Sequence, residues 1–203
     1  MGKPKYYKSE IINNKDMKTF FYKLVYTFLA LSMAVFVYAV NKSLTIDRVF
    51  DKMGCKDCSV WLSDHIPAII SYLLYLGVLI GIAFALKHFS RSLTYIDMSE
   101  GNVKSIEQAS DGMMLTYFGL FFFALSVTNV TALIITFTIL MVCVMFSNVY
   151  MFNPIFSLIL YRFYYITFTN GKKCLLLSRE KFEHGDAVKI DRLYKLNEFT
   201  YID

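Results

Sequence analysis

Residues 161–180 read YRFYYITFTNGKKCLLLSRE and decide how the chain ends. The pair Asn170-Gly171 is a strong signal for a two-residue β-hairpin turn, because a type I′ turn needs positive φ at both central positions. The flanking segments 161–169 and 172–180 are rich in aromatic and branched residues, which favour strands. The stretch therefore predicts an antiparallel hairpin.

Both faces of this hairpin are apolar. With a two-residue turn, one face carries Tyr164, Ile166, Leu175 and Leu177, and the other carries Phe163, Tyr165, Cys174 and Leu176. A lone two-stranded hairpin is marginally stable in water, so both faces need cover. Segments 188–196 and 199–202 are expected to supply part of it as strands or a short helix. The rest must come from the helices, another copy of the chain or a different protein.

The composition upstream indicates a membrane protein. Of the 203 residues, 56% are hydrophobic and 18% are charged, whereas globular domains are about 25% charged. The apolar residues form blocks at about 19–40, 66–86, 113–127 and 130–152. A bilayer core of ~30 Å takes ~20 helical residues. We therefore predict four spans, and the alternative is three spans with a re-entrant segment.

The predicted fold class is an all-α membrane protein, a four-transmembrane-helix bundle with a small cytoplasmic β-hairpin tail. Its parts are a basic N-terminal tail (1–18), the bundle (19–152) with an outer loop (41–65) and an inner loop (87–112), and the hairpin tail (153–203). Short helical pieces are expected at 93–98 and 103–109 in the inner loop. Lysine and arginine concentrate in both tails, which predicts that both termini are cytoplasmic.

The outer loop contains an apolar stripe and two cysteines. Ile46, Val49, Phe50 and Met53 repeat at helical spacing, which indicates either an interfacial helix or a cap packed on the ends of the bundle. Cys55 and Cys58 are expected to form a local disulfide, since thiols outside the cytoplasm tend to be oxidised. A zinc site with Asp64 and His65 is an alternative that lacks an evident fourth ligand.

The predicted spans carry no ionisable side chain beyond their ends, which argues against proton relays, voltage sensors and ion-coupled carriers. Gly77 and Gly81 form a small-xxx-small face, which is typical of close helix packing. The three histidines have no neighbouring nucleophile, and no glycine-rich phosphate loop is present. We therefore expect no enzymatic activity and no cofactor. The scattered cations also disfavour direct nucleic-acid binding.

The tail carries a recognisable pattern: Asn153-Pro154-Ile155-Phe156, Leu158, Tyr161-Arg162, Tyr164, Asn170-Gly171 and 175–179. In this pattern and in its predicted spans, the chain resembles the KwaA family, the membrane subunits of the bacterial Kiwa anti-phage systems. The resemblance implies an inner-membrane sensor of phage attachment or injection. It also implies a cytoplasmic DNA-binding effector of the KwaB type as the partner.

Three functional hypotheses follow. The first is a non-enzymatic membrane sensor and scaffold, the second a small oligomeric channel or pore, and the third a structural subunit of a larger membrane complex. In the first, the hairpin docks the effector through Arg162, Phe163, Tyr165 and Arg179, because aromatic and arginine side chains dominate interface hot spots. The alternative is that these side chains only pack on the base of the bundle. We also expect a homo-oligomer, with a tetramer as a guess.

Overall fold

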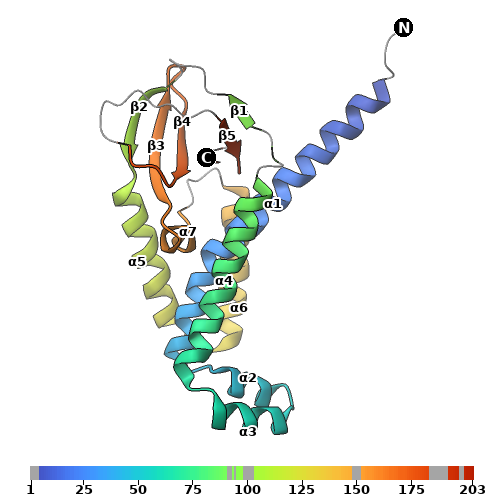
Figure 1. The fold of residues 1–203 in the computed structure, drawn as a ribbon, viewed down its shortest axis with the longest axis vertical. Helices are drawn as coiled ribbons and strands as arrows, with labels where there is room; N and C mark the ends of the chain where they lie inside the picture. The colour runs from blue at the N-terminus through green and yellow to red at the C-terminus, as the bar shows by residue number, and fades with distance from the viewer. Residues whose placement is uncertain are drawn as a thin grey trace.

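The computed structural model describes residues 5–90, 93, 95–97, 103–147, 152–182, 192–196 and 199–203. Helices fill one end of the molecule, and a β-sheet lies at the other end (Figure 1). The helices are α1 (Lys5–Asn41), α2 (Ile46–Lys52), α3 (Lys56–His65), α4 (Ala68–Ser90), α5 (Ser110–Ser126), α6 (Val130–Phe146) and α7 (Pro154–Leu158). The strands are β1 (Tyr95–Asp97), β2 (Val103–Gln108), β3 (Arg162–Phe168), β4 (Lys173–Ser178), β5 (Arg192–Lys195) and β6 (Thr200–Ile202).

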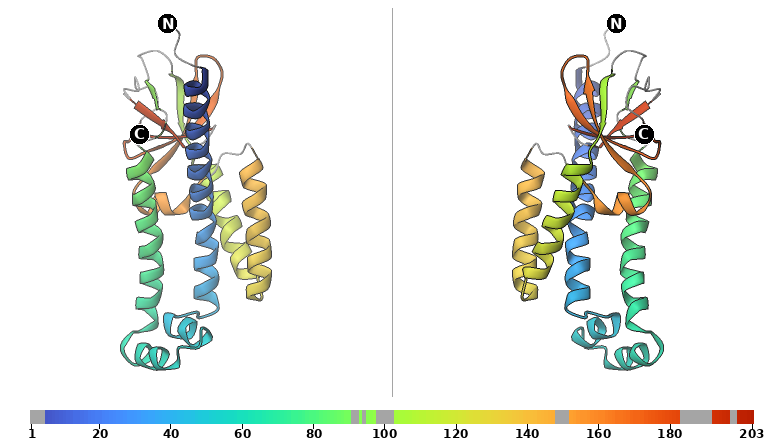
Figure 2. Two further views of the ribbon diagram at one scale, coloured as in Figure 1. Left: turned by 90° about the vertical axis from the view of Figure 1, so that its right-hand side faces the viewer. Right: turned by 90° about the vertical axis from the view of Figure 1, so that its left-hand side faces the viewer.

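Helix α1 is the central element of the helical part and packs against α4, α5 and α6. Its buried residues include Tyr26, Leu29, Ala30, Ala34 and Tyr38, which recur every three to four positions and so form one face. The short helices α2 and α3 lie at the end of α1 and α4 that is remote from the sheet (Figure 2). Helices α4 and α6 are apolar on all sides, and many of their large side chains are exposed, Leu73 and Ile139 among them.

The sheet has six strands in the order β1-β5-β6-β4-β3-β2. Strands β4 and β6 run parallel, and every other neighbouring pair is antiparallel. The strands come from three separate parts of the chain, 95–108, 162–178 and 192–202. The expectation that the end of the tail adds strands to the hairpin is confirmed by β5 and β6.

Both faces of the sheet are covered within the chain. Phe163, Leu175, Leu177 and Ile202 join a core with Tyr26, Ile155 and Phe156 from the helical part. Tyr164, Ile166, Cys174, Leu176, Leu193 and Tyr201 form a second core with Ile106 on the opposite face. Phe182 packs edge-on against Tyr164 at a centroid distance of 5.2 Å and contributes to this cover. The prediction that the hairpin needs cover on both sides thus describes the sheet well.

The predicted fold class, a four-helix bundle with a small hairpin, is wrong. The described residues form seven helices, of which Met17–Asn41 within α1 and Ala68–Ser90 are long and apolar enough to cross a membrane. Helices α5 and α6 have 17 residues each, about 25 Å, which is shorter than a hydrocarbon core of ~30 Å. The uncharged run 112–161 is longer than these two helices because its last part forms α7 and packs under the sheet.

Three further elements, β1, β2 and α1, also differ from expectation. Strands β1 and β2 occupy positions where helical pieces were predicted, at 93–98 and 103–109. Strand β2 pairs with β3, and Ile106 lies opposite Ile166. Pairing with a distant strand therefore overrides the local helical pattern. In addition, α1 begins at Lys5, so it includes most of the segment that was expected to be a separate tail.

The hairpin exists, but its predicted turn is wrong by one residue. The amide of Gly171 donates to the carbonyl of Phe168, and the amide of Phe168 donates to the carbonyl of Lys172, both at 2.9 Å. The loop thus has three residues, with positive φ at Gly171 alone, a standard alternative for hairpins. Ile166 consequently lies opposite Cys174 rather than Leu175. This slip moves the β4 side chains to the opposite faces from those predicted.

Candidate functional site at the junction of the helices and the sheet

The short helix α7 lies between the helical part and the sheet and packs against α1 and α4. Asn153 caps it: its side-chain oxygen accepts a hydrogen bond from the amide of Ile155 at 3.0 Å. Its side-chain nitrogen donates to the carbonyl of Tyr26 in α1 at 3.3 Å. Pro154 at the first helical position has no amide to leave unpaired. Asn153 is fully buried, so one side chain fixes both the start of α7 and its distance from α1.

Aromatic rings fill the space around α7. Phe156 lies 5.7 Å from Tyr26 and 5.5 Å from Tyr161, between ring centroids. Phe152 makes edge-on contacts with Phe163 at 5.5 Å and Tyr165 at 6.1 Å. Each such pair adds ~0.5–1.5 kcal/mol beyond the area it buries. The rings therefore attach strand β3 firmly to the helical part.

A polar contact ties the end of α4 to the end of β6. The Lys87 ammonium donates to the Asp203 main-chain oxygen, and it lies 4.0 Å from the side-chain carboxylate of the same residue. Ser178 of β4 also donates to that carboxylate. Lys87 is 5.4 Å from the centre of the Tyr161 ring. Ion pairs that are partly exposed to solvent contribute ~0–1 kcal/mol to the stability of a protein. The contact therefore stabilises the fold little, and its effect is to hold the end of α4 next to the sheet.

The start of α5 also approaches the sheet closely, at Gly112. A Cβ atom added there would lie 2.8 Å from the Tyr165 hydroxyl oxygen and 2.9 Å from Cε2 of Phe152. Burial, with a smaller contribution from the Asp111 carboxylate, raises the pKa of Tyr165 above its usual range. The Tyr165 hydroxyl therefore stays neutral at physiological pH beside the backbone of α5.

We predict that Gly112→Ala destabilises the protein by ~1–3 kcal/mol, because a methyl group there overpacks the junction. Gly119→Ala is the matched control in the same helix, since a Cβ there would meet nothing within 4 Å. The control should be neutral or stabilising by up to ~1 kcal/mol through helix propensity. Thermal unfolding of both variants in detergent measures the difference. Equal melting temperatures would show that the junction is not tightly packed at this point.

The four predicted docking residues lie in two different environments. Arg162 and Arg179 are exposed on the sheet, and the Arg179 guanidinium lies 4.8 Å from the centre of the Tyr161 ring. Phe163 is 2% exposed and Tyr165 is half-buried, and both face the helical part. The two arginines are thus exposed to solvent, and the two aromatic rings support the sheet.

The outer-loop cysteines lie near the start of α3, where Cys55 is the N-cap residue and Cys58 is within the first turn. Both are free, exposed thiols in the structure, and a disulfide between them stays a prediction. Differential alkylation and mass spectrometry of protein isolated without reductant measure it, and two free thiols would contradict it. His65 stacks on Trp61 at 4.8 Å. No group of three metal-ligating side chains occurs in the described part of the chain, so the zinc alternative has no support.

The apolar stripe of the outer loop does form a helix, α2. Val49, Phe50 and Met53 are exposed on it, and its position at a membrane surface stays a prediction. Gly77 and Gly81 are exposed on α4, and a Cβ at either would meet nothing within 4 Å. They make no close helix contact within one chain, so a contact between copies stays a prediction.

Sequence reasoning identified the tail but missed the residues that build the junction. Asn153 was named only as part of the tail pattern, although an Asn before Pro is also a helix-start signal. Gly112 carried no signal, because its role depends on Tyr165 and Phe152, which are distant in sequence. The Lys87–Asp203 contact likewise joins residues that only the folded chain brings together.

Comparison with known proteins gives one finding. The model of the KwaA family, described as an anti-phage protein, matches residues 22–202. No curated protein and no solved structure matches the chain. The matched range includes α2 to α7, every described strand and the second half of α1, so it contains all of the junction residues described above except Asp203.

Proposed function

Because the chain belongs to the KwaA family of anti-phage proteins, we propose that it is a non-enzymatic membrane sensor and scaffold. In this role it recruits and controls a cytoplasmic DNA-binding effector of the KwaB type. Anti-phage defence is the family's function. The membrane placement, the partner and the absence of catalysis are the proposed parts.

The membrane placement follows from the two long apolar helices. Met17–Asn41 and Ala68–Ser90 meet the length and hydropathy expected of a span. Leu73 and Val78 on α4 are 61% and 63% exposed, as in a helix that faces lipid. The sheet and the N-terminal end of α1 lie at the same end of the molecule (Figure 1). The lysine-rich termini support a cytoplasmic position for that end by the positive-inside rule.

The observation that carries the sensor role is the attachment of the sheet to both of these helices. Asn153 joins α7 to α1, and Lys87 joins α4 to β6. A change in the relative position of α1 and α4 must therefore alter the sheet or break these contacts. The exposed arginines at 162 and 179 then lie on the element that such a change displaces.

The scaffold role predicts that these arginines bind the partner. We expect Arg162→Ala combined with Arg179→Ala to reduce recovery of the effector by about 30-fold, the equivalent of ~2 kcal/mol at a hot spot. The measurement is co-purification of the effector with the tagged full chain in mild detergent. Lys104→Ala combined with Lys172→Ala removes the same charge from other exposed positions of the sheet. Equal recovery with both double variants would contradict docking through the arginines.

A channel through the helices needs polar groups along its path, and hydroxyl groups are the candidates in these apolar helices. Ser32, Thr136 and Thr138 donate instead to carbonyls of their own helices, at 2.6–2.8 Å. Their protons are therefore not available to an anion, and the groove between α1, α4 and α6 that contains Ser32 and Thr138 is otherwise lined mainly by apolar side chains, which suits an ion poorly. We therefore place the sensor ahead of the channel, and ion flux in liposomes separates the two.

A further inference from the structure

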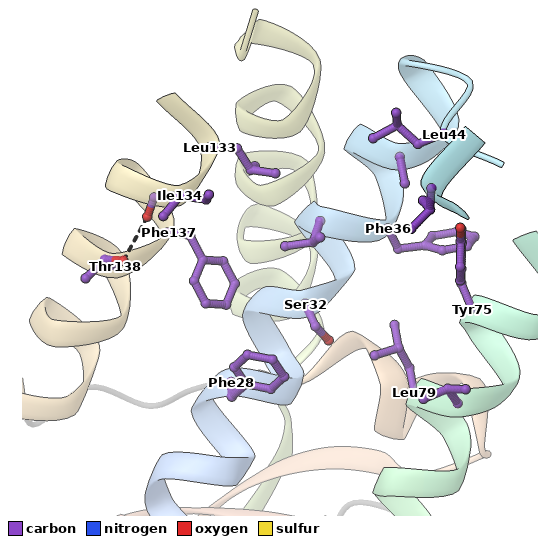
Figure 3. A pocket seen from close by; sticks show the side chains of 14 residues that line it. Phe28, Ser32, Phe36, Leu44, Tyr75, Leu79, Leu133, Ile134, Phe137 and Thr138 are labelled. Carbon is purple, nitrogen blue, oxygen red and sulfur yellow. Dashed lines mark hydrogen bonds between the residues drawn. The ribbon is translucent and has the colours of Figure 1, made fainter. Parts of the chain in front are cut away.

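An apolar groove lies between α1, α4 and α6 (Figure 3). Its cavity volume is about 600 Å³, within the range of small-molecule sites. Side chains from all three helices line it, including Phe28, Val35, Ala39, Val78, Leu79 and Phe137. Helices α4 and α6 both pack on α1, and the groove separates them in the view of Figure 3.

Three of the residues that line the groove carry a hydroxyl group, Ser32, Tyr75 and Thr138. The Ser32 hydroxyl donates to the carbonyl of Leu29 at 2.6 Å. The Thr138 hydroxyl donates to the carbonyl of Ile134 at 2.8 Å, the dashed line in Figure 3. A polar ligand would lose its water here and gain few hydrogen bonds in return. The walls therefore favour an apolar occupant.

The length of the groove matches one leaflet of a bilayer. From Phe28 to Ala39 along α1 the groove extends for about 16 Å at 1.5 Å per residue, and half of a ~30 Å hydrocarbon core is about 15 Å. Phe28 and Phe137 meet edge-on at 5.7 Å and narrow its inner end. Leu44 and Val49 line its other end, where α1 turns into α2.

A cation lies at this second end. Arg48 is exposed and donates to the carbonyl of Ser43 at 3.1 Å, which holds its guanidinium at the turn beside Leu44. Lys42 and Lys52 are exposed nearby in sequence, and Asp47 and Asp51 belong to the same short helix. Arginine is well suited to a phosphate, because its planar fork donates two hydrogen bonds to phosphate oxygens.

We propose that the groove holds an acyl chain of a membrane phospholipid, with the phosphate of that lipid at Arg48. The proposal rests on the proposed membrane placement. In this arrangement one bound lipid contacts both α4 and α6 and so links the two helices. The position of α4 relative to α1 then depends on a lipid that exchanges with the bilayer, and α4 holds the sheet through Lys87.

A helix from a second copy of the chain is the competing occupant, because the walls of the groove are apolar. An extended acyl chain needs no hydrogen-bond partner, and the phosphate of its lipid gives Arg48 an anionic partner that a second apolar helix does not supply. The cation at the end of the groove therefore favours lipid over protein.

The test is native mass spectrometry of the full chain taken into mild detergent from vesicles of phosphatidylethanolamine and phosphatidylglycerol. We expect one phospholipid retained per chain. Val35→Phe and Val78→Phe place a ring in the groove at positions 36% and 63% exposed, and retention should fall at least ten-fold. Val142→Phe is the control, on α6 and outside the groove, and should retain lipid as the parent chain does. Arg48→Gln should also lower retention, and Lys52→Gln should not.

Equal lipid retention in all variants would overturn the proposal, because it would mark the lipid as part of a general annulus. The proposal would also be overturned if the parent chain retained no lipid and formed an oligomer that the groove variants do not form. That result would identify a second copy of the chain as the occupant. An alkaline wash of membranes shows whether only the lipid site is wrong or whether the chain is not embedded in the membrane at all. A chain that stays in the membrane but retains no lipid overturns the groove alone, whereas a chain that is washed off overturns the placement.

Discussion

Phe163→Ala is expected to destabilise the protein by ~3–5 kcal/mol, the usual cost of removing a fully buried aromatic ring. Phe163 is 2% exposed, and its ring meets Phe152 at 5.5 Å. It lies in the core that the sheet shares with the helical part. Truncation leaves a cavity at that boundary, so we expect a large drop in the melting temperature in detergent.

Phe122→Ala is the matched control for this prediction. Its ring is 64% exposed on α5, so its removal should change the melting temperature little. A Phe163→Ala protein with normal stability and lost partner binding would contradict the structural role, and it would restore Phe163 as a contact residue. A fall in stability as large for Phe122→Ala would instead show that the ring at 122 is covered by another molecule.

Asn153→Ala is expected to cost ~1–3 kcal/mol, because the lost helix cap leaves a buried amide without its acceptor. The buried amide is that of Ile155, whose acceptor is the Asn153 side chain. The contact with the carbonyl of Tyr26 is lost as well. Chemical or thermal unfolding in detergent measures the effect.

Asn129→Ala provides the control, because Asn129 is also an N-cap that accepts from a helical amide, that of Ala132 at 2.8 Å. Asn129 is exposed, so water replaces its hydrogen bond and the cost should be ~1 kcal/mol or less. A similar loss for the two variants would mean that burial at 153 adds nothing. In that case the link between α7 and α1 would be weak.

The positions of the main helices follow from the sequence because apolar blocks of helical length are a local signal. The blocks at 19–40, 66–86, 113–127 and 130–152 correspond to α1, α4, α5 and α6. The local sequence does not decide whether each block crosses a membrane, because this depends on where the helix ends. Helix α6 ends at Phe146, before the end of its apolar block at residue 152.

The sequence predicted the pairing of strands only within the hairpin, where the two strands are adjacent in the chain. The hairpin of β3 and β4 was predicted from Asn170-Gly171, but this pair fits both a two-residue and a three-residue loop. The surroundings choose between the loops: the observed register places Phe163, Leu175 and Leu177 toward the helices. The pairing of β2 with β3 joins distant segments, and no local pattern announces it.

The junction was not foreseen for the same reason. Asn153 and Gly112 are important through side chains of α1 and β3 that contact them in the folded chain. The prediction of docking at four residues treated the tail as an exposed element. Two of them, Phe163 and Tyr165, pack against the helical part, and exposed positions remain at Arg162 and Arg179.

The most direct measurement of the proposed function is the efficiency of phage plating on cells that carry the complete defence system. The central claim is that defence passes through the exposed surface of the sheet. It predicts that Arg162→Ala combined with Arg179→Ala abolishes protection while membrane level and melting temperature stay near those of the parent. Lys104→Ala combined with Lys172→Ala should protect fully. Full protection by the arginine double variant, at normal expression, would contradict the claim.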